Sequence, residues 1–297
     1  MTPQLSIVIA TTLPWVEIQA CLRSLAPQLV AAQAEVIVGD THSGEIPDDI
    51  LCEFPFVQWL RREGMSVFHL RNLGLLAAKA PVVAFTEDHC VVAPDWCERL
   101  LAAHRAQPAA AAVGGSVNNG STDRAIDWAN FLFVFAPFLP PVTTGPAEQI
   151  SLQANISYKR DALPQAMNPN GLMEMALNRE LVKAGRMLYA DGGLCVRHIQ
   201  SHGFRGSFAA HFHNGRSIAT VRMEKLKGLG RALRLASCAI LPAFLFVYVA
   251  RHVASKPRFW GPYIWAAPFI AGLTVAQALG EFCGYAFGPG NSLESVR

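Results

Sequence analysis

The sequence predicts an α/β fold in which the first half builds a doubly wound, mostly parallel sheet and the last part forms membrane-associated helices. The first observation is that short apolar runs, each typical of a buried strand, alternate with helical patterns as far as Phe85. The second is a composition of 52% hydrophobic and only 16% charged residues, which is too apolar for an ordinary soluble domain. We therefore expect one α/β domain over residues 1–222 and a membrane-associated helical segment over residues 223–297.

The elements of the predicted sheet follow one another along the N-terminal half. LSIVIA at residues 5–10 reads as a buried strand, and residues 15–29 place their apolar side chains close to one face of a helix. The further elements are strands at residues 35–40, near 56–60 and at 81–85, and a helix at 71–79. This alternation implies parallel strands joined by right-handed crossovers. Dinucleotide-binding and P-loop versions are excluded, because neither Gly-x-Gly-x-x-Gly after the first strand nor Gly-Lys-Ser/Thr occurs.

Metal-capable side chains follow the strand at residues 81–85. Glu87, Asp88 and His89 stand at its carboxyl end, where open α/β sheets bind their ligands. Carboxylate oxygens with one imidazole suit Mg²⁺ or Mn²⁺, and such an ion would neutralise a diphosphate. The alternative is a solvated acidic turn that caps a helix starting near Asp95.

The apolar excess is concentrated near the C-terminus. Residues 235–250 and 259–280 carry no charge, and each run approaches the ~20 residues that a spanning helix requires. Residues 1–9 show no secretory signal, so we expect the preceding domain to face the cytosol from the cytoplasmic (inner) membrane. The cations just before these runs fit an anionic cytoplasmic leaflet; they are Arg222, Lys225, Lys227, Arg231 and Arg234.

The topology of the two runs stays open. If both span, the basic loop at residues 251–258 lies outside, against the positive-inside tendency. A re-entrant hairpin, or interfacial helices broken at Pro242, Pro262 and Pro268, would remove the conflict. A further apolar stretch at residues 128–139 is too short to span, and it is a hydrophobic slot, an interfacial segment or a core helix.

Composition excludes several other classes. The seven cysteines contain no Cys-x-x-Cys pair, which argues against a zinc ribbon or a disulfide framework. A net charge of +3 is too small to indicate nucleic-acid binding, and none is expected.

Several motifs in order resemble the family-2 glycosyltransferases of the glycosyltransferase-A fold, over residues 5–216. They are LSIVIATT (5–12), CLRSLAPQ (21–28), VGDTHS (38–43), RNLG (71–74) and EDH (87–89). The resemblance implies that a nucleotide-sugar donor is bound by Thr11, Asp40, Arg71, Asn72 and Asp88, and that a divalent metal, Mn²⁺ or Mg²⁺, is held by Glu87 and His89. Two departures from the family pattern are Gly39, where the first acid of the nucleoside turn stands, and EDH in place of Asp-x-Asp.

The second half continues the resemblance. QANISYKR at residues 153–160 is similar to the family's acceptor segment, which implies an acceptor-side role for Asn155, Tyr158 and Arg160. The segment 171–185 resembles the family's acidic helix, with Glu174 as the catalytic base and Met173 where a second acid usually stands. The late motifs imply that His198 is a metal ligand and that Arg216 contacts phosphate. Each of these residues also has an alternative interpretation without a role in catalysis or binding. Glu174 would only favour the helix dipole, His198 would be structural, and Arg216 would be a solvated surface arginine.

The resulting hypothesis is an inverting transferase that moves a sugar from a nucleotide sugar to a lipid-linked, hydrophobic or glycan acceptor. A carboxylate is needed to take the proton of the attacking hydroxyl, and one displacement inverts the anomeric centre. The competing hypothesis of another class is a nucleotide-sugar-binding pseudoenzyme that serves as the membrane partner of an active transferase, because Gly39, Glu87, His89 and Met173 depart from the family pattern. A nucleotidyltransferase is weaker, since no Gly-rich basic loop follows the first strand.

Overall fold

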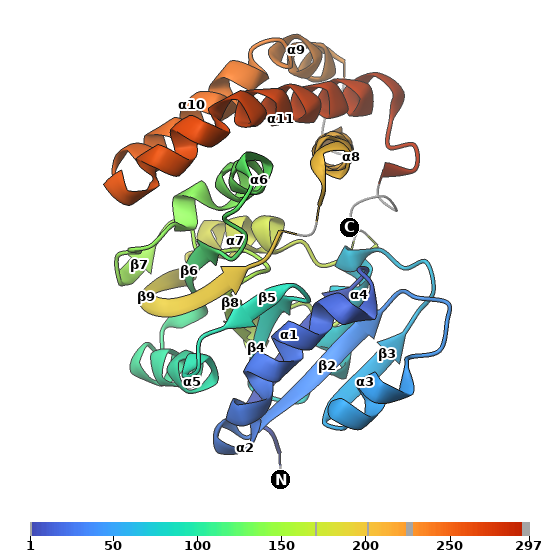
Figure 1. Cartoon of the computed structure of the whole chain (residues 1–297), viewed down its shortest axis with the longest axis vertical. Helices are drawn as coiled ribbons and strands as arrows, with labels where there is room; N and C mark the ends of the chain where they lie inside the picture. Colours follow the sequence, from blue (N-terminus) through green and yellow to red (C-terminus); the bar gives the residue numbers. More distant parts are fainter. Residues whose placement is uncertain (1, 170, 201, 224–227, 293–297) are drawn as a thin grey trace. The chain divides into compact units, whose positions relative to one another are not determined.

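The computed structural model describes residues 2–169, 171–200, 202–223 and 228–292, so Lys225 and Lys227 lie outside the described residues. The chain divides into two compact units (Figure 1). Unit 1 comprises Met1–Asn118 and Phe138–Ile199, and unit 2 comprises Asn119–Pro137 and Gln200–Arg297. The predicted domain boundary after Arg222 falls in the last turn of the helix Phe204–Met223. The division into these two domains stays a prediction.

Unit 1 is built on one mixed sheet. Its strands are β1 (Leu5–Thr11), β2 (Ala34–Asp40), β3 (Val57–Arg61), β4 (Val82–Glu87), β5 (Cys90–Val92), β6 (Ala110–Asn119), β7 (Gly145–Ala147), β8 (Ile156–Lys159) and β9 (Met187–His198). They are ordered β3-β2-β1-β4-β8-β6-β9-β5, and β7 pairs with β9. The pairings from β3 to β4 are parallel, whereas β4–β8, β6–β8, β5–β9 and β7–β9 are antiparallel. The α/β class is confirmed. The parallel part of the sheet is formed by the region in which strands and helices alternate along the sequence.

The helices of unit 1 follow the strands as apolar periodicity predicts. They are α1 (Trp15–Leu25), α2 (Leu29–Ala32), α3 (Asp48–Glu53), α4 (Val67–Ala77), α5 (Trp96–Ala106) and α7 (Glu174–Lys183). In α1, Ile18, Cys21, Leu22 and Leu25 are buried on one face. The helix ends where Pro27 enters a 3₁₀ turn at Ala26–Gln28, so the predicted 15–29 helix is divided in two.

The predicted strand-end chemistry meets at one edge of the sheet. In the parallel registers, Thr11 pairs with Asp40, and Ala10 pairs with Glu87. The carboxyl ends of β1, β2 and β4 therefore present Thr11, Asp40 and Glu87 side by side. This edge positions the candidate site.

Unit 2 consists of helices. They are α6 (Ala125–Phe135), α8 (Phe204–Met223), α9 (Leu229–Ser237), α10 (Leu241–Ala254) and α11 (Trp260–Phe287). Among the described residues, one helical segment, Pro257–Phe287, is long and apolar enough to cross a membrane, and α9 with α10 passes the same test only as a pair bent by 62°. The stretch 128–139 lies mostly in α6, which packs against α11, as the core-helix interpretation predicts.

The contact between α8 and α11 brings their backbones together. A Cβ at Gly280 of α11 would overlap the carbonyl oxygen of Phe212, and one at Gly215 of α8 would overlap that of Gln277. Polar side chains of α11 are buried within this unit; they are Thr274, Gln277 and Glu281. Only glycine permits so close an approach of two helices.

The glycine contact leads to a stability prediction. We expect Gly280→Ala to lower the unfolding free energy by about 1–3 kcal/mol, because the added methyl group displaces a backbone carbonyl. Gly261→Ala in the same helix meets no atom within 4 Å and should stabilise by up to about 1 kcal/mol through helix propensity. Urea unfolding of both variants measures the difference, and equal effects would contradict the described packing.

Candidate active site

Three metal-capable side chains converge at the carboxyl end of β4. His198 Nε2 lies 3.1 Å from Glu87 Oε2, and His89 Nε2 lies 4.0 Å from the same oxygen. The two imidazole Nε2 atoms are 2.9 Å apart. His198 reaches the turn because β9 pairs with β5, with Cys90 opposite His198 in the register. The structure thus brings together the three predicted metal ligands, Glu87, His89 and His198.

The charges in this cluster are strongly coupled. Burial opposes ionisation of Glu87, but its hydrogen bond to His198 and the charges of His89 and Arg71 outweigh burial and lower its pKa to about 2. Burial likewise opposes protonation of His89, yet Asp88, whose Oδ1 lies 2.6 Å from Nδ1, raises the pKa of His89. The pKa of His198 is lowered by burial and then by the charge of His89.

The donor set fits a divalent cation. Two Nε2 atoms can face each other at 2.9 Å only when a proton or a cation lies between them, because each otherwise presents a lone pair. Oδ2 of Asp88 is buried and lacks a hydrogen-bond partner. Cys90 adds a further ligand-capable atom, since its Sγ lies within 4.8 Å of the ligand atoms of Glu87 and His198. Burial raises the pKa of the Cys90 thiol well above its usual range.

Arg71 connects this cluster to Glu174. Its Nη2 lies 3.4 Å from Glu87 Oε1, and its Nε lies 3.6 Å from Glu174 Oε1. Glu174 is the first residue of α7 and is 3% exposed, and its Oε1 has no hydrogen-bond partner. Burial raises the pKa of Glu174, and Arg71 partly opposes this rise. A desolvated carboxylate with a free oxygen is the arrangement that a general base requires.

Asn72 holds the loop that leads into α7. Its Oδ1 accepts a hydrogen bond of 2.7 Å from the backbone N–H of Asn168, and its Nδ2 donates to the carbonyl of Ala166 at 3.5 Å. The neighbouring residue His69 contacts the carbonyl of Pro169 at 2.9 Å through Nε2. Asn72 is fully buried, so the contacts described for this predicted donor-binding residue position the Glu174 loop.

The loop contacts of Asn72 lead to a second prediction. Asn72→Ala should reduce the turnover of the predicted transfer reaction more than it raises the donor KM. It should also cost about 1–3 kcal/mol of stability, because the N–H of Asn168 loses its acceptor. Gln165→Ala in the same loop removes an exposed side chain whose described hydrogen bonds go to the carbonyls of Arg160 and Leu163, and it should leave turnover unchanged. Steady-state kinetics separates the two parameters, and a donor KM that rises alone would assign Asn72 to the donor instead.

A second polar group occupies the ends of β1 and β2. Asp40 is fully buried, with its Oδ2 3.4 Å from both Trp15 Nε1 and Arg61 Nε, and its Oδ1 2.5 Å from His42 Nδ1. The rings of Trp15 and His42 lie 4.7 Å apart. Thr11 is buried beside them, and its hydroxyl donates to the carbonyl of Leu13. The predicted donor residues Thr11 and Asp40 thus share one edge with Glu87.

The predicted acceptor-side residues cross-link the sheet. Asn155 Nδ2 donates to the carbonyl of Ser116 at 2.9 Å, and Tyr158 OH donates to Asn178 of α7 at 2.8 Å. Arg160 donates to the carbonyls of Ala78 and Ala80. Asn155 and Tyr158 are fully buried, so these contacts secure β8 and α7, and the acceptor-side role stays a prediction.

Arg216 belongs to unit 2. Its Nε donates to the carbonyl of Gly288 at 2.8 Å, so the described contact of this residue is with the end of α11. Its predicted phosphate contact stays a prediction.

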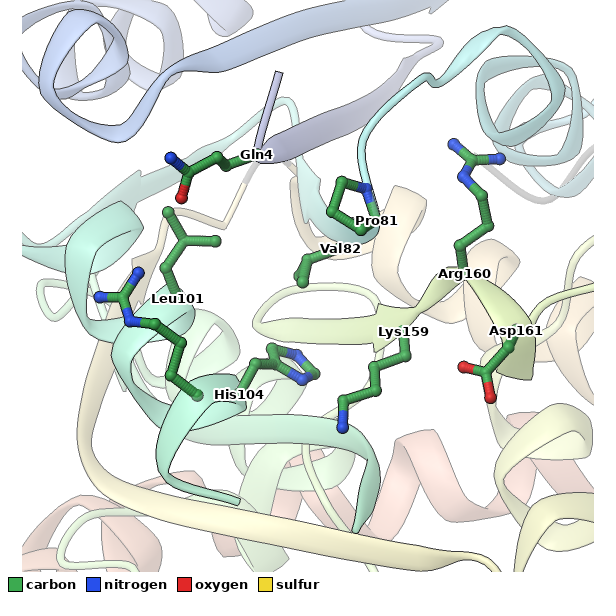
Figure 2. A pocket seen from close by; sticks show the side chains of 9 residues that line it. Gln4, Pro81, Val82, Leu101, His104, Lys159, Arg160 and Asp161 are labelled. Carbon is green, nitrogen blue, oxygen red and sulfur yellow. The ribbon is translucent and has the colours of Figure 1, made fainter. Parts of the chain in front are cut away.

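A pocket of about 520 Å³ lies at the opposite edge of the parallel strands (Figure 2). Gln4, Pro81 and Val82 place it at the amino ends of β1 and β4. His104 lines it from α5, Lys159 from β8 and Arg160 from the turn that follows β8. The predicted site residues other than Arg160 are absent from its lining. This pocket is therefore separate from the candidate site.

Sequence reasoning missed several residues around the site. Cys90 follows EDH directly and is the first residue of β5. Its place next to the predicted ligands was the signal that could have added it to the candidate metal ligands. Trp15, His42 and Arg61 surround Asp40, and all three lie at or just beyond elements that end at the same edge.

Comparison with known proteins agrees with this geometry. Residues 6–165 match the model of glycosyl transferase family 2. EpsH of Bacillus subtilis (strain 168), a glycosyltransferase by name, is 28% identical over 104 residues, which are 34% of this chain and 30% of EpsH. The chain thus spans less than a third of the length of this curated relative.

Two solved structures share the fold. The mannosyltransferase PcManGT from Pyrobaculum calidifontis, solved with GDP-Man and Mn²⁺, matches at a TM-score of 0.58 and 15% identity, over 95% of this chain and 87% of that one. Residues 1–349 of S. aureus TarS match at 0.50 and 12% identity, over 95% and 91%.

These matches identify a glycosyltransferase-A-type fold, as the sequence motifs predicted. The chain belongs to glycosyl transferase family 2, and the family resemblance is confirmed. The family makes it a glycosyltransferase by class.

Proposed function

We propose that this protein transfers a sugar from a nucleotide-sugar donor to a hydroxyl of a lipid-linked or other glycan acceptor, with inversion, at the cytosolic face of the cytoplasmic membrane. The observation that carries the proposal is one connected group at the carboxyl edge of the sheet, in which Arg71 joins the Glu87–His89–His198 cluster to the buried Glu174. A transferase needs a site for diphosphate charge and a base for the acceptor, and this group supplies both.

Glu174 takes the proton of the attacking hydroxyl. Its position in the first turn of α7 and its contact with Arg71 keep the carboxylate oriented, and burial strengthens it as a base by raising its pKa. The hydroxyl oxygen then attacks the anomeric carbon from the side opposite the diphosphate, so a single displacement inverts that centre. No second nucleophile is required.

Glu87, His89 and His198 are the residues that would hold a divalent metal, with Asp88 orienting the His89 ring through Nδ1. A bound ion would offset the negative charge that develops on the departing nucleoside diphosphate. The PcManGT complex with GDP-Man and Mn²⁺ supports such an ion and such a donor. Two imidazoles favour Mn²⁺ over Mg²⁺, because nitrogen ligands suit the softer ion.

The acceptor and the location are supported by unit 2. Its long apolar helix α11 and its cations support attachment to an anionic membrane face, where lipid-linked acceptors are found. The pseudoenzyme alternative is favoured by Gly39 alone among the described contacts. A Cβ there would lie 3.0 Å from both the Cβ and the carbonyl oxygen of Leu70, so an acidic side chain at this position would require Leu70 to shift.

The test is transfer from a panel of radiolabelled nucleotide sugars to membrane lipid extract by purified protein with Mn²⁺. Formation of a labelled lipid product of inverted configuration is expected for at least one donor. Donor binding without transfer or hydrolysis would assign the chain to the pseudoenzyme class.

A further inference from the structure

We propose that unit 2 binds an anionic lipid surface with α9, α10 and α11 lying in the plane of the membrane, and that α11 does not cross it. The inference rests on the membrane attachment proposed above and selects its geometry. It depends only on residues of unit 2. A transfer assay in detergent tests the reaction separately, because that reaction uses residues of unit 1.

One side of α11 is closed by a polar helix. The close approach of α8 runs from Phe208 against Gly272 to Ala219 against Gly284. Within this contact, Asn214 Nδ2 donates to Gln277 Oε1 at 3.4 Å, and Arg222 pairs with Glu281 at 2.8 Å. The two helices therefore form one unit that enters or leaves a membrane together.

The composition of α8 opposes a spanning arrangement. Arg205 is exposed, and His213, Asn214 and Arg216 are only partly buried. If α11 crossed the bilayer, α8 would carry these groups into the hydrocarbon beside it. Charged and hydrogen-bonding side chains are costly there, so the pair is better placed where one side remains in water.

The opposite side of α11 exposes large apolar side chains. Ile264, Val275, Leu279 and Phe282 are 71%, 47%, 54% and 43% exposed. Their separations of eleven, four and three residues place them on one face of the helix, away from Gly280 and Glu281. Trp260 and Trp265 are also exposed near the start of α11, and tryptophan is enriched at membrane interfaces. A one-sided apolar face of this length fits a surface.

The neighbouring helices extend this face and supply its charge. No described residue of α9 is buried; Leu229 and Leu233 are exposed one turn apart, whereas Arg231 and Arg234 lie on the other side of the helix. Figure 1 shows α10 alongside α11, and Phe244 of α10 is exposed. Among described residues 228–292 the sole carboxylate side chain, Glu281, is paired with Arg222, and the exposed cations are Arg231, Arg234, Arg251 and Arg258. This charge is complementary to anionic headgroups.

Vesicle binding tests the partner. The full chain, exchanged out of detergent, should float with phosphatidylcholine vesicles that contain phosphatidylglycerol, and bind pure phosphatidylcholine vesicles at least ~10-fold more weakly. Equal binding to both would overturn the charge argument. If the chain does not bind vesicles and forms a dimer through this face, the face would be assigned to contact with a second copy instead.

Matched variants test the face. Ile264→Gln with Phe282→Gln should reduce vesicle binding at least ~10-fold, since the apolar contact is lost. Val30→Gln is the control, because Val30 in α2 of unit 1 is 90% exposed and lies outside the proposed surface. An equal loss in both variants, or in neither, would overturn the assignment.

Labelling from one side tests the orientation. Ser255, before α11, and Asn291, after it, are exposed, and each is replaced by cysteine. In intact spheroplasts, neither Ser255→Cys nor Asn291→Cys should gain label from a membrane-impermeant maleimide over the wild-type background, and both should gain it after permeabilisation. Labelling of either variant in intact spheroplasts would place one end of α11 outside and show that α11 spans.

Discussion

Glu174→Gln is expected to lower the turnover of sugar transfer by ~10²–10⁴-fold while donor affinity stays within a few-fold of wild type. The amide keeps the size of the side chain and its place in the first turn of α7, but it cannot accept the acceptor proton. Glu174 is buried and lies 3.6 Å from Arg71. Because the amide has the same size, the packing of the neighbouring residues should be unchanged.

The matched control is Glu180→Gln, an exposed carboxylate on the same helix. It should leave turnover unchanged, which separates proton transfer from the general charge of α7. Steady-state kinetics and a thermal unfolding scan are the measurements. A mutant that retains turnover contradicts the base assignment, and a collapse in stability would favour the helix-dipole interpretation.

His198→Gln is expected to weaken Mn²⁺ binding by at least ~10–100-fold, the loss usual when a metal site is disturbed. His198 Nε2 lies within 3.1 Å of both His89 Nε2 and Glu87 Oε2, so its removal breaks the centre of the cluster. Titration of the protein with Mn²⁺, followed by the electron paramagnetic resonance of the free ion, measures this without any substrate.

Two further variants define the donor set. His89→Asp should shift preference toward Mg²⁺, because an oxygen replaces a nitrogen ligand. His252→Gln in α10 removes an imidazole of unit 2 and should leave Mn²⁺ affinity unchanged. Unaltered Mn²⁺ affinity in His198→Gln would show that His198 is not a ligand.

Local pattern was sufficient to predict the parallel half of the sheet. Apolar runs at β1, β2 and β4 are buried on both faces, and the polar residues that follow them meet at one edge because parallel strands share their carboxyl ends. Glu87 and His89 could therefore be placed from their own strand. His198 could not be placed this way, because it lies 109 residues from His89 and reaches it only through the β5–β9 pairing.

The predicted membrane segment shows the same limit. Absence of charge located α10 and α11, but it could not indicate that α11 packs on α8, whose polar sequence gives no apolar signal. The glycines that permit this contact also resemble ordinary helix residues in a sequence. Tyr158 and Asn155 matched a family motif, yet their contacts are with the strands and helix around them, which no motif reports.

The pairing of Cys90 with His198 also bears on how the site comes into existence. A contact between residues so distant in the chain exists only where the folded sheet pairs β9 with β5. Unfolded chains would therefore keep the proposed ligands apart and would bind a cation weakly. Binding to the native state alone raises the unfolding temperature with ligand concentration. Occupancy of this site would thus report the folded fraction of unit 1. A thermal shift with metal and donor measures ligand binding and the stability of unit 1 in one experiment.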